Sequence, residues 1–202
     1  MVHIDMSDSS EFCCVRNYFN NYLCKIYIEE IRSGHFRPAS VDSGGDPYLN
    51  ASLRRTTQVS ISQTADRRLR LYLGELQPWL ERRFRLALHG FESPQYLLYR
   101  PGDFFTRHID SAKQSTRSTS ALERKVSVVV YLNGYASNTA EEGFKGGSLT
   151  LFPEATAEGA PISNGARLDP VPGLLVAFRS YILHEVSPVT FGERFTIVSW
   201  FY

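Results

Sequence analysis

Three side chains in the second half of the chain have the types and the spacing to hold a metal ion. His108 and Asp110 stand two residues apart, and residues two apart in an extended strand point to the same face. One imidazole and one carboxylate would then meet at one point. His184 lies in another β-rich run and offers a second imidazole. We therefore expect His108, Asp110 and His184 to form one catalytic metal site.

This ligand set indicates oxygen chemistry at iron. Two His and one carboxylate on one face of an iron leave three coordination positions open, which is how non-haem Fe(II) oxygenases hold a co-substrate and dioxygen together. The His108–Asp110 pair and His184 are each weak evidence for a metal site when taken alone. A single His in a strand is more often a hydrogen-bonded core or surface residue. The chain has only 5 histidines, so their joint occurrence in β-rich runs strengthens the prediction.

Arg194 could bind an anion next to such a metal. It follows His184 in sequence, and strand alternation places Arg194, Thr196 and Trp200 on one face of a strand. A buried guanidinium is costly unless it is paired, and its planar fork fits a carboxylate. We therefore expect Arg194 to point inward and to bind a carboxylate.

A second interpretation of Arg194 is a surface salt bridge to Glu185 or Glu193, because exposed Arg pairs are common. Tyr131 and Thr196 could add hydroxyl donors to the carboxylate that Arg194 binds. A Tyr in a strand is by default a packing residue, however. The sequence alone leaves both interpretations open.

The elements that must position these residues fall into two groups. Before residue 90, apolar residues at three- and four-residue spacing predict a helix over 11–33 and a second helix over 64–84, which must kink or break at Pro78. Between them, residues 41–55 are expected to be a mobile loop and residues 57–61 a short strand.

Beyond Gly90 the chain consists of short β-rich runs separated by turn residues. Such runs predict a β-sandwich or barrel, and we favour a mainly β fold with helices (α+β), a double-sheet jelly roll (cupin-like) with the N-terminal helices packed on one sheet. We expect one domain over 1–202, with residues 1–90 as helical support and mobile loop and residues 91–202 as the β core. The expected strands are 95–99, 126–132, 148–152, 174–178 and 195–202. Residues 111–124 and 134–145 are expected to be long loops.

Composition excludes several functional classes. The 202 residues carry 22 basic and 21 acidic side chains, a net charge of +1, and their basic clusters lie in a helical pattern that indicates a solvated face, so no nucleic-acid partner is expected. Cys13, Cys14 and Cys24 suit free thiols in a reducing compartment. No leader or apolar span is recognised, so we expect a soluble cytoplasmic protein without a membrane partner. The oligomeric state is left open.

The sequence resembles the 2-oxoglutarate- and Fe(II)-dependent oxygenases of the prolyl 4-hydroxylase type, including bacterial relatives of the hypoxia-factor prolyl hydroxylases. The resemblance covers about half the chain. The residues that carry it, in order, are Gln95–Tyr99, Arg107–Asp110, 130–133, 146–151, 172–173, 184–188 and 194–201.

The resemblance implies a double-stranded β-helix with Fe(II) on His108, Asp110 and His184. It also implies 2-oxoglutarate and O2 as co-substrates, ascorbate as an auxiliary reductant, and release of succinate and CO2. The implied substrate is a prolyl residue of a protein or peptide. A free amino acid or other small molecule is the alternative, and a non-catalytic jelly-roll binding module is less favoured.

The resemblance also implies roles for the residues around the iron. Arg194 and Tyr131 would bind the distal carboxylate of 2-oxoglutarate, Thr196 would assist, and Tyr99 and Trp200 would line the cavity near the metal. Collagen-type members carry Lys where this chain has Arg194, which points to the hypoxia-factor-like branch. Nucleic-acid demethylases of the superfamily carry a second Arg at the position of Trp200, which disfavours that activity. The stretch between Asp110 and Tyr131 is longer than the resemblance leads us to expect.

Overall fold

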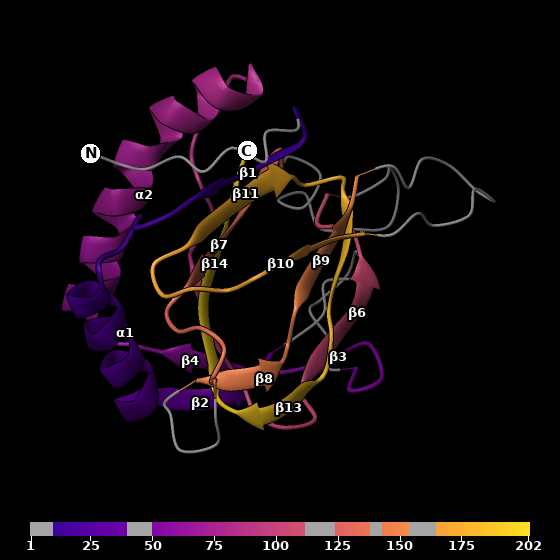
Figure 1. Cartoon of the computed structure of the whole chain (residues 1–202). Coiled ribbons are helices and arrows are strands. Elements are labelled where there is room, and N and C mark those ends of the chain that lie inside the picture. Colours follow the sequence, from indigo (N-terminus) through magenta and orange to yellow (C-terminus); the bar gives the residue numbers. More distant parts are fainter. Residues whose placement is uncertain (1–9, 40–49, 112–123, 138–142, 154–164) are drawn as a thin grey trace.

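Two antiparallel β-sheets face one another, and two helices cover the outer side of the larger sheet (Figure 1). This computed structural model describes residues 10–39, 50–111, 124–137, 143–153 and 165–202. The expected fold class, mainly β with helices in a double-stranded β-helix arrangement, is confirmed by this topology. None of the helices in the described ranges is long and apolar enough to cross a membrane.

The larger sheet has seven strands in the order β1-β11-β7-β14-β5-β4-β2, and the smaller has five in the order β10-β9-β12-β6-β3. A two-stranded sheet, β13-β8, lies at one end of the pair (Figure 1). The strands of the larger sheet are β1 (Phe12–Val15), β2 (His35–Pro38), β4 (Thr57–Ser60), β5 (Gln95–Tyr99), β7 (Val126–Tyr131), β11 (Leu175–Arg179) and β14 (Arg194–Phe201). The remaining strands are β3 (Arg54–Arg55), β6 (Phe104–His108), β8 (Phe144–Gly146), β9 (Leu149–Phe152), β10 (Ala166–Leu168), β12 (Leu183–Val186) and β13 (Val189–Gly192).

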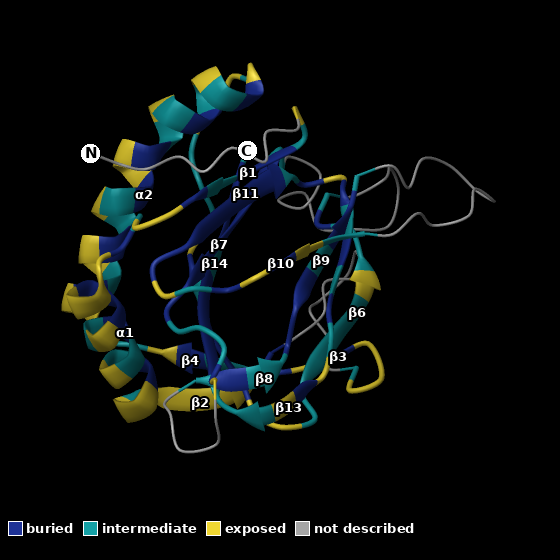
Figure 2. Ribbon diagram, in the orientation of Figure 1, coloured by how far each residue is buried: buried dark blue, intermediate teal, exposed yellow. Residues whose placement is uncertain are grey.

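The helices are α1 (Asn21–Ser33) and α2 (Gln63–Phe84), and each begins at a side-chain cap. The Asn20 side chain accepts a hydrogen bond from the backbone N–H of Leu23 at 2.8 Å, which satisfies one donor of the first turn of α1. Apolar side chains at helical spacing form the buried stripe of α2: Ala65, Leu69, Leu73, Leu76, Leu80 and Phe84. These stripes pack on the larger sheet and leave the other helix faces exposed (Figure 2).

The expected helix over 11–33 is wrong in its first half, where the chain forms strand β1 and pairs with β11. The side chains of β1 alternate between two cores. Cys13 and Val15 belong to the core between helices and sheet, whereas Phe12 packs in the core between the sheets. A strand buried on both faces is apolar throughout, so its residues also fit a helical spacing.

Of the kink or break expected at Pro78, the break does not occur, because α2 runs through Pro78 as one helix. Pro78 lies on the exposed side of α2, and the residue one turn before it is Gly74, also exposed. Proline removes one hydrogen bond at that site. Leu76 and Leu80 are buried on either side of it, and this packing favours a continuous helix.

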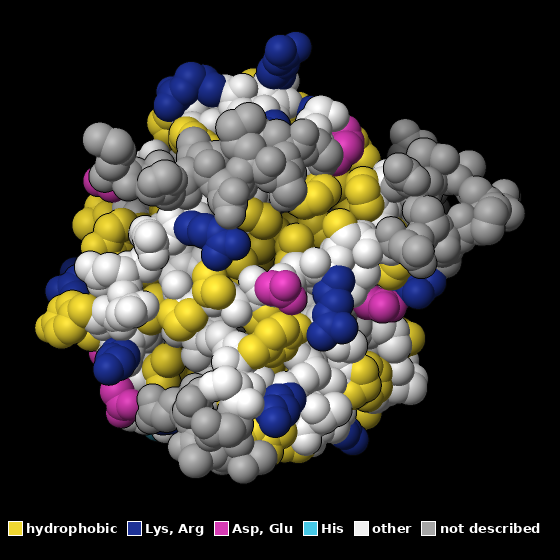
Figure 3. Space-filling model, viewed as in Figure 1, with side chains coloured by type: hydrophobic (Ala, Val, Ile, Leu, Met, Phe, Trp, Pro, Cys, Tyr) yellow, Lys and Arg dark blue, Asp and Glu magenta, His cyan; other side chains and the backbone are white. Residues whose placement is uncertain are grey.

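The expected loops are only partly described. Residues 41–49, 112–123 and 138–142 lie outside the described residues, but the ends of two of these stretches form the strands β3 and β8. The predicted strands at 57–61, 95–99, 126–132, 148–152, 174–178 and 195–202 are confirmed to within one or two residues at their ends. Figure 3 shows one face of the molecule, on which Lys and Arg side chains are scattered and do not form one patch.

Candidate metal centre and its cavity

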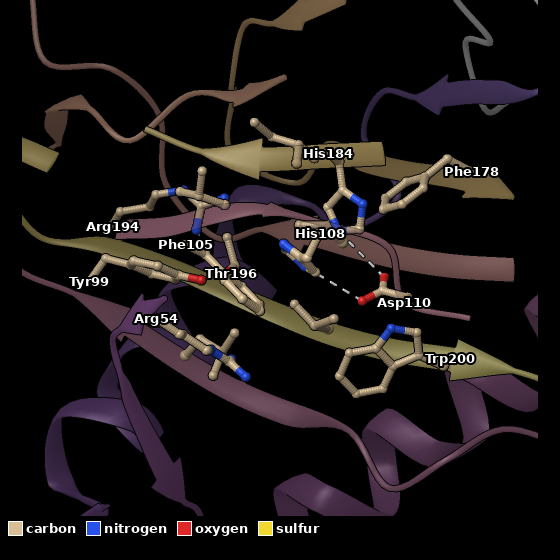
Figure 4. A pocket seen from close by; sticks show the side chains of 15 residues that line it. Arg54, Tyr99, Phe105, His108, Asp110, Phe178, His184, Arg194, Thr196 and Trp200 are labelled. Atoms are coloured by element: carbon tan, nitrogen blue, oxygen red, sulfur yellow. Dashed lines mark hydrogen bonds and ion pairs between the residues drawn. The ribbon is translucent and has the colours of Figure 1, made fainter. Parts of the chain in front are cut away.

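Two histidines from neighbouring strands face each other between the sheets (Figure 4). His108 is the last residue of β6, and it lies directly opposite His184 of β12 in the antiparallel register. Directly opposed residues of such a pair project to the same side, so the two imidazoles meet, with ring centroids 4.1 Å apart. Strand pairing therefore brings together two residues that are far apart in sequence.

Asp110 reaches the same point by a different route from the one that strand alternation suggests. Strand β6 ends at His108, and Asp110 lies in the bend beyond it, where its backbone N–H donates to the carbonyl oxygen of Ser180 at 2.9 Å. Its carboxylate oxygens lie 3.7 Å from His108 Nε2 and 3.5 Å from His184 Nε2. The three ligand atoms fall within 4.8 Å of one another, so the expected convergence is confirmed.

The backbone fixes which imidazole nitrogen faces the carboxylate. His108 Nδ1 lies 2.7 Å from the Thr106 carbonyl oxygen, and His184 Nδ1 lies 2.9 Å from the Ile182 carbonyl oxygen. A carbonyl oxygen can only accept, so each Nδ1 carries a proton, and in a neutral imidazole the lone pair then lies on Nε2. These second contacts are typical of metal-binding histidines. Two bare Nε2 atoms and one carboxylate fit a divalent iron ion.

The protonation states of His108 and Asp110 also fit a metal ion. Burial lowers the pKa of His108 to about 3, and the neighbouring His184 adds to the effect. Burial alone would raise the pKa of Asp110, but His184, His108 and a hydrogen bond from Ser127 lower it to about 2. At neutral pH His108 is therefore neutral and Asp110 is charged, as metal binding requires.

A buried pair of hydroxyl groups orients the Asp110 carboxylate, and sequence analysis missed it. Ser127 Oγ donates to Asp110 Oδ2 at 2.7 Å and lies 2.9 Å from Ser180 Oγ. Both serines are fully buried. The signal in the sequence was the hydroxyl of Ser127 within the otherwise apolar run at the start of β7. These hydrogen bonds hold one carboxylate oxygen in place and leave the other directed towards His108.

Arg194 points into the cavity from β14, as expected, and only 1% of it is exposed. Its guanidinium lies 4.7 Å from the ring centre of Tyr99 and 5.0 Å from that of Tyr131, and its Nη1 donates to Thr196 Oγ1 at 3.3 Å. Within the described ranges, Arg194 Nε and the Tyr131 hydroxyl have no hydrogen-bond partner although both are buried. A buried Nε–H and a buried hydroxyl without partners suit a carboxylate.

The surface salt bridge considered for Arg194 is not what the structure shows. Glu185 pairs with Arg107 at 2.8 Å, and Glu193 pairs with Arg100 at 3.5 Å. Arg194 is buried away from both pairs. The inward orientation is therefore confirmed.

One cavity between the sheets contains the metal ligands and most of the other expected site residues. Tyr99, Thr196, Trp200 and Arg194 line it together with the three ligands, whereas Tyr131 lies behind them against Arg194. The other residues of the wall are mostly apolar: Leu97, Phe105, Val129, Leu149, Phe178, Val186 and Val198. The wall also includes Arg54, which sequence analysis did not select.

Trp200 lies beside Asp110 in the cavity wall (Figure 4), and an ion pair packs against it. The guanidinium of Arg124 lies 4.1 Å from the centre of the Trp200 ring system and donates through Nη2 to Glu92 at 2.7 Å. Arg124 also reaches the Asp110 carbonyl oxygen at 3.5 Å. The Arg124–Glu92 pair thus contacts both Trp200 and the backbone of Asp110.

Comparison with known proteins places these residues in a family context. Residues 94–202, just over half of the chain, match the sequence model of the 2OG-Fe(II) oxygenase superfamily. A PKHD-type hydroxylase of Shewanella oneidensis is 29% identical over 110 residues, which cover 54% of this chain and 42% of the relative. The matched stretch thus spans less than half the length of that relative.

Solved structures of prolyl hydroxylases have a similar fold. A prolyl-4-hydroxylase of Pseudomonas putida superposes with a TM-score of 0.70 at 25% identity, covering 95% of this chain and 91% of the other. A prolyl hydroxylase of Trichoplax adhaerens, solved with a fragment of the hypoxia inducible factor, gives a TM-score of 0.71 at 21% identity, covering 96% and 84%. The second similarity, at lower identity, concerns the fold alone.

Proposed function

The chain belongs to the 2OG-Fe(II) oxygenase superfamily, and we propose that it hydroxylates an unactivated C–H bond of a prolyl residue in a protein or peptide. In this reaction 2-oxoglutarate and O2 are consumed and succinate and CO2 are released. The observation that carries the proposal is the convergence of His108, Asp110 and His184 in one cavity with the buried Arg194.

His108, Asp110 and His184 bind Fe(II) through two Nε2 atoms and one carboxylate oxygen. The iron supplies the redox chemistry with O2 that no amino-acid side chain provides. The protein contributes the ligand geometry, since the backbone contacts of both imidazoles and the Ser127 hydrogen bond hold the ligands before the metal arrives. Three ligands from the protein leave coordination positions for the co-substrates.

Arg194 binds the distal carboxylate of 2-oxoglutarate, with the Tyr131 hydroxyl as a second donor and Thr196 orienting the guanidinium. Support comes from the buried, open hydrogen-bonding groups of Arg194 and Tyr131. Tyr99 contacts the Arg194 guanidinium, and Trp200 bounds the cavity beside Asp110. The mostly apolar wall lowers the local dielectric constant, which strengthens each of these polar contacts.

The prolyl substrate is supported by the similarity to the Pseudomonas putida prolyl-4-hydroxylase. An aromatic and aliphatic wall formed by Phe105, Trp200 and Val198 suits an apolar ring such as pyrrolidine. A free amino acid is the second candidate, favoured by the buried Arg54 in the same wall. Ascorbate is proposed as a reductant that sustains repeated turnover.

Succinate release from 2-oxoglutarate tests this function. The purified chain with Fe(II), O2 and ascorbate is expected to release succinate, faster with a proline-containing peptide than without it. Mass spectrometry should then find the peptide heavier by one oxygen atom. Faster release with free proline than with peptide would favour the second candidate. No release under any condition, with the metal shown to be bound, would contradict the proposal.

A further inference from the structure

Arg54 is a second arginine of the cavity, on the side opposite β14. It lies in β3, which pairs with β6, so that Arg54 is opposite Phe105 and close to the strand that carries His108. Only 8% of Arg54 is exposed, and its guanidinium lies 4.8 Å from the centre of the Phe105 ring. Its Nη2 donates to Gln95 Oε1 at 3.2 Å. Figure 4 shows Arg54 and Arg194 on the two sides of Tyr99.

The neighbouring residue shows that this burial is specific to Arg54. Arg55 points to the opposite side of the same short strand, with 54% of its side chain exposed, and pairs with Asp103 at 3.2 Å. Arg55 therefore has the environment expected of an ordinary surface arginine. Arg54 has a different environment, because it lines the cavity together with His108 and Asp110 and contacts Phe105 and Gln95.

The positive and negative charges of the cavity do not balance once Fe(II) and 2-oxoglutarate are bound. The charged residues of the wall, among those that the structure describes, are Arg54, Arg194 and Asp110. Burial lowers the pKa of Arg54, while Tyr99 and Asp110 oppose that shift, and a guanidinium stays protonated at neutral pH. Divalent iron and dianionic 2-oxoglutarate offset each other, as do Asp110 and Arg194. One positive charge, that of Arg54, is then left in the wall.

We infer that Arg54 binds a carboxylate of the substrate beside the carbon that is hydroxylated. The inference rests on the proposed function and narrows its substrate class to an α-amino acid or a peptide with a carboxylate next to the reacting residue. A planar guanidinium fork binds a carboxylate through two parallel hydrogen bonds, and the ring of Phe105 holds it in plane. A carboxylate at this position offsets the remaining charge of the cavity.

Binding without turnover gives the most direct test. The full chain is loaded with Mn(II) and 2-oxoglutarate, and calorimetry compares ligands in pairs: proline with prolinamide, and a peptide ending in proline with its C-terminal amide. An acidic peptide with an internal proline next to Asp is compared with its Asn counterpart. We expect the carboxylate form to bind about tenfold to a hundredfold more tightly in one pair, as for a charge-assisted hydrogen bond. The pair that discriminates identifies the source of the carboxylate.

Variants then assign the preference to Arg54. R54Q should abolish the carboxylate preference, R54K should retain part of it, and R55Q should retain all of it. The affinity for 2-oxoglutarate should change little in R54Q. A preference that survives in R54Q, no preference in any pair, or a main loss of 2-oxoglutarate affinity in R54Q would overturn the inference. R54K keeps the test valid if R54Q folds poorly.

The inference and the proposed function can fail separately. Succinate release that depends on peptide or proline, without any carboxylate preference, would leave the oxygenase activity standing and remove the role of Arg54. A carboxylate preference in the binding assay without succinate release would keep the Arg54 subsite and contradict the proposed reaction.

Discussion

The two faces of the seven-stranded sheet differ in the kind of residue they bury. The face towards the helices is apolar, and β7 contributes Val126, Val128 and Val130 to it. The face towards the smaller sheet carries the polar side chains of the cavity, among them Arg194 and Thr196 of β14. Both faces are buried (Figure 2). Along β14, successive residues thus alternate between the apolar core against the helices and the wall of the cavity.

Because neighbouring residues of a strand lie on opposite faces, substitutions at adjacent positions can change stability and activity separately. Burying an apolar side chain stabilises the fold, whereas a buried charge such as Arg194 costs free energy until it is paired. Removing a residue from the site face should therefore cost activity and little stability. Removing a residue from the helix face should do the reverse.

The largest expected effect is at the metal centre. D110A removes one of three protein ligands, so Fe(II)-dependent activity should be abolished, and H108A should do the same. The measurement is succinate release at saturating Fe(II), with thermal unfolding as a control for folding. Full activity in either variant would contradict the metal assignment. A strong drop in the unfolding temperature of either variant would contradict the claim that residues of the site face contribute little to stability.

The next effect is expected one residue from Arg194 but on the opposite face. F195A removes a side chain that is 1% exposed in the core between helices and sheet. The free energy of unfolding should fall by about 3 to 5 kcal/mol, because a large buried ring leaves a cavity. Urea denaturation gives this value. At a temperature where F195A is folded, its Michaelis constant for 2-oxoglutarate should stay near that of the wild type.

Arg194 provides the matching change on the site face. R194A should weaken 2-oxoglutarate binding by about 2 to 5 kcal/mol, because a desolvated charge pair is lost. The effect should appear as a raised Michaelis constant for 2-oxoglutarate in the succinate assay, with urea denaturation little changed. An unaltered constant would place Arg194 outside the co-substrate site.

The smallest effect is expected from the hydroxyl that orients Asp110. S127A removes the 2.7 Å hydrogen bond to Asp110 Oδ2. Loss of such a supporting contact typically lowers metal affinity about tenfold to a hundredfold. Competition of Mn(II) binding with a fluorescent chelator measures this directly, and S127T, which keeps the hydroxyl, is the matched control. Equal affinities in S127A and the wild type would assign Ser127 to packing alone.

The sequence was most informative where local rules apply. Alternation along β14 correctly predicted that Arg194, Thr196 and Trp200 share a face, because a regular strand has a period of two. Alternation was not the reason for the position of Asp110, since β6 ends before it and the Ser180 carbonyl oxygen holds its backbone. The convergence was predicted correctly, although its geometric basis was different.

The features that were missed depend on contacts between residues far apart in the chain. Arg54 enters the cavity only because β3 pairs with β6, and Ser127 reaches Asp110 only because β7 runs beside the bend that follows β6. The strand at Phe12–Val15 was predicted as helix for the same reason, since its pairing partner β11 lies at the other end of the sequence. The periodicity of one segment does not predict which distant strand it pairs with.

The hydrogen bonds of the two imidazoles have a consequence for how this centre tolerates sequence change. Each acceptor is a peptide carbonyl two positions earlier in the chain, at Thr106 or Ile182, and not a side chain. A point substitution replaces side chains and keeps every peptide group, so no single exchange at either position deletes the acceptor. The orientation of the coordinating nitrogens therefore depends on the backbone path of the two segments and not on the identity of a neighbouring side chain.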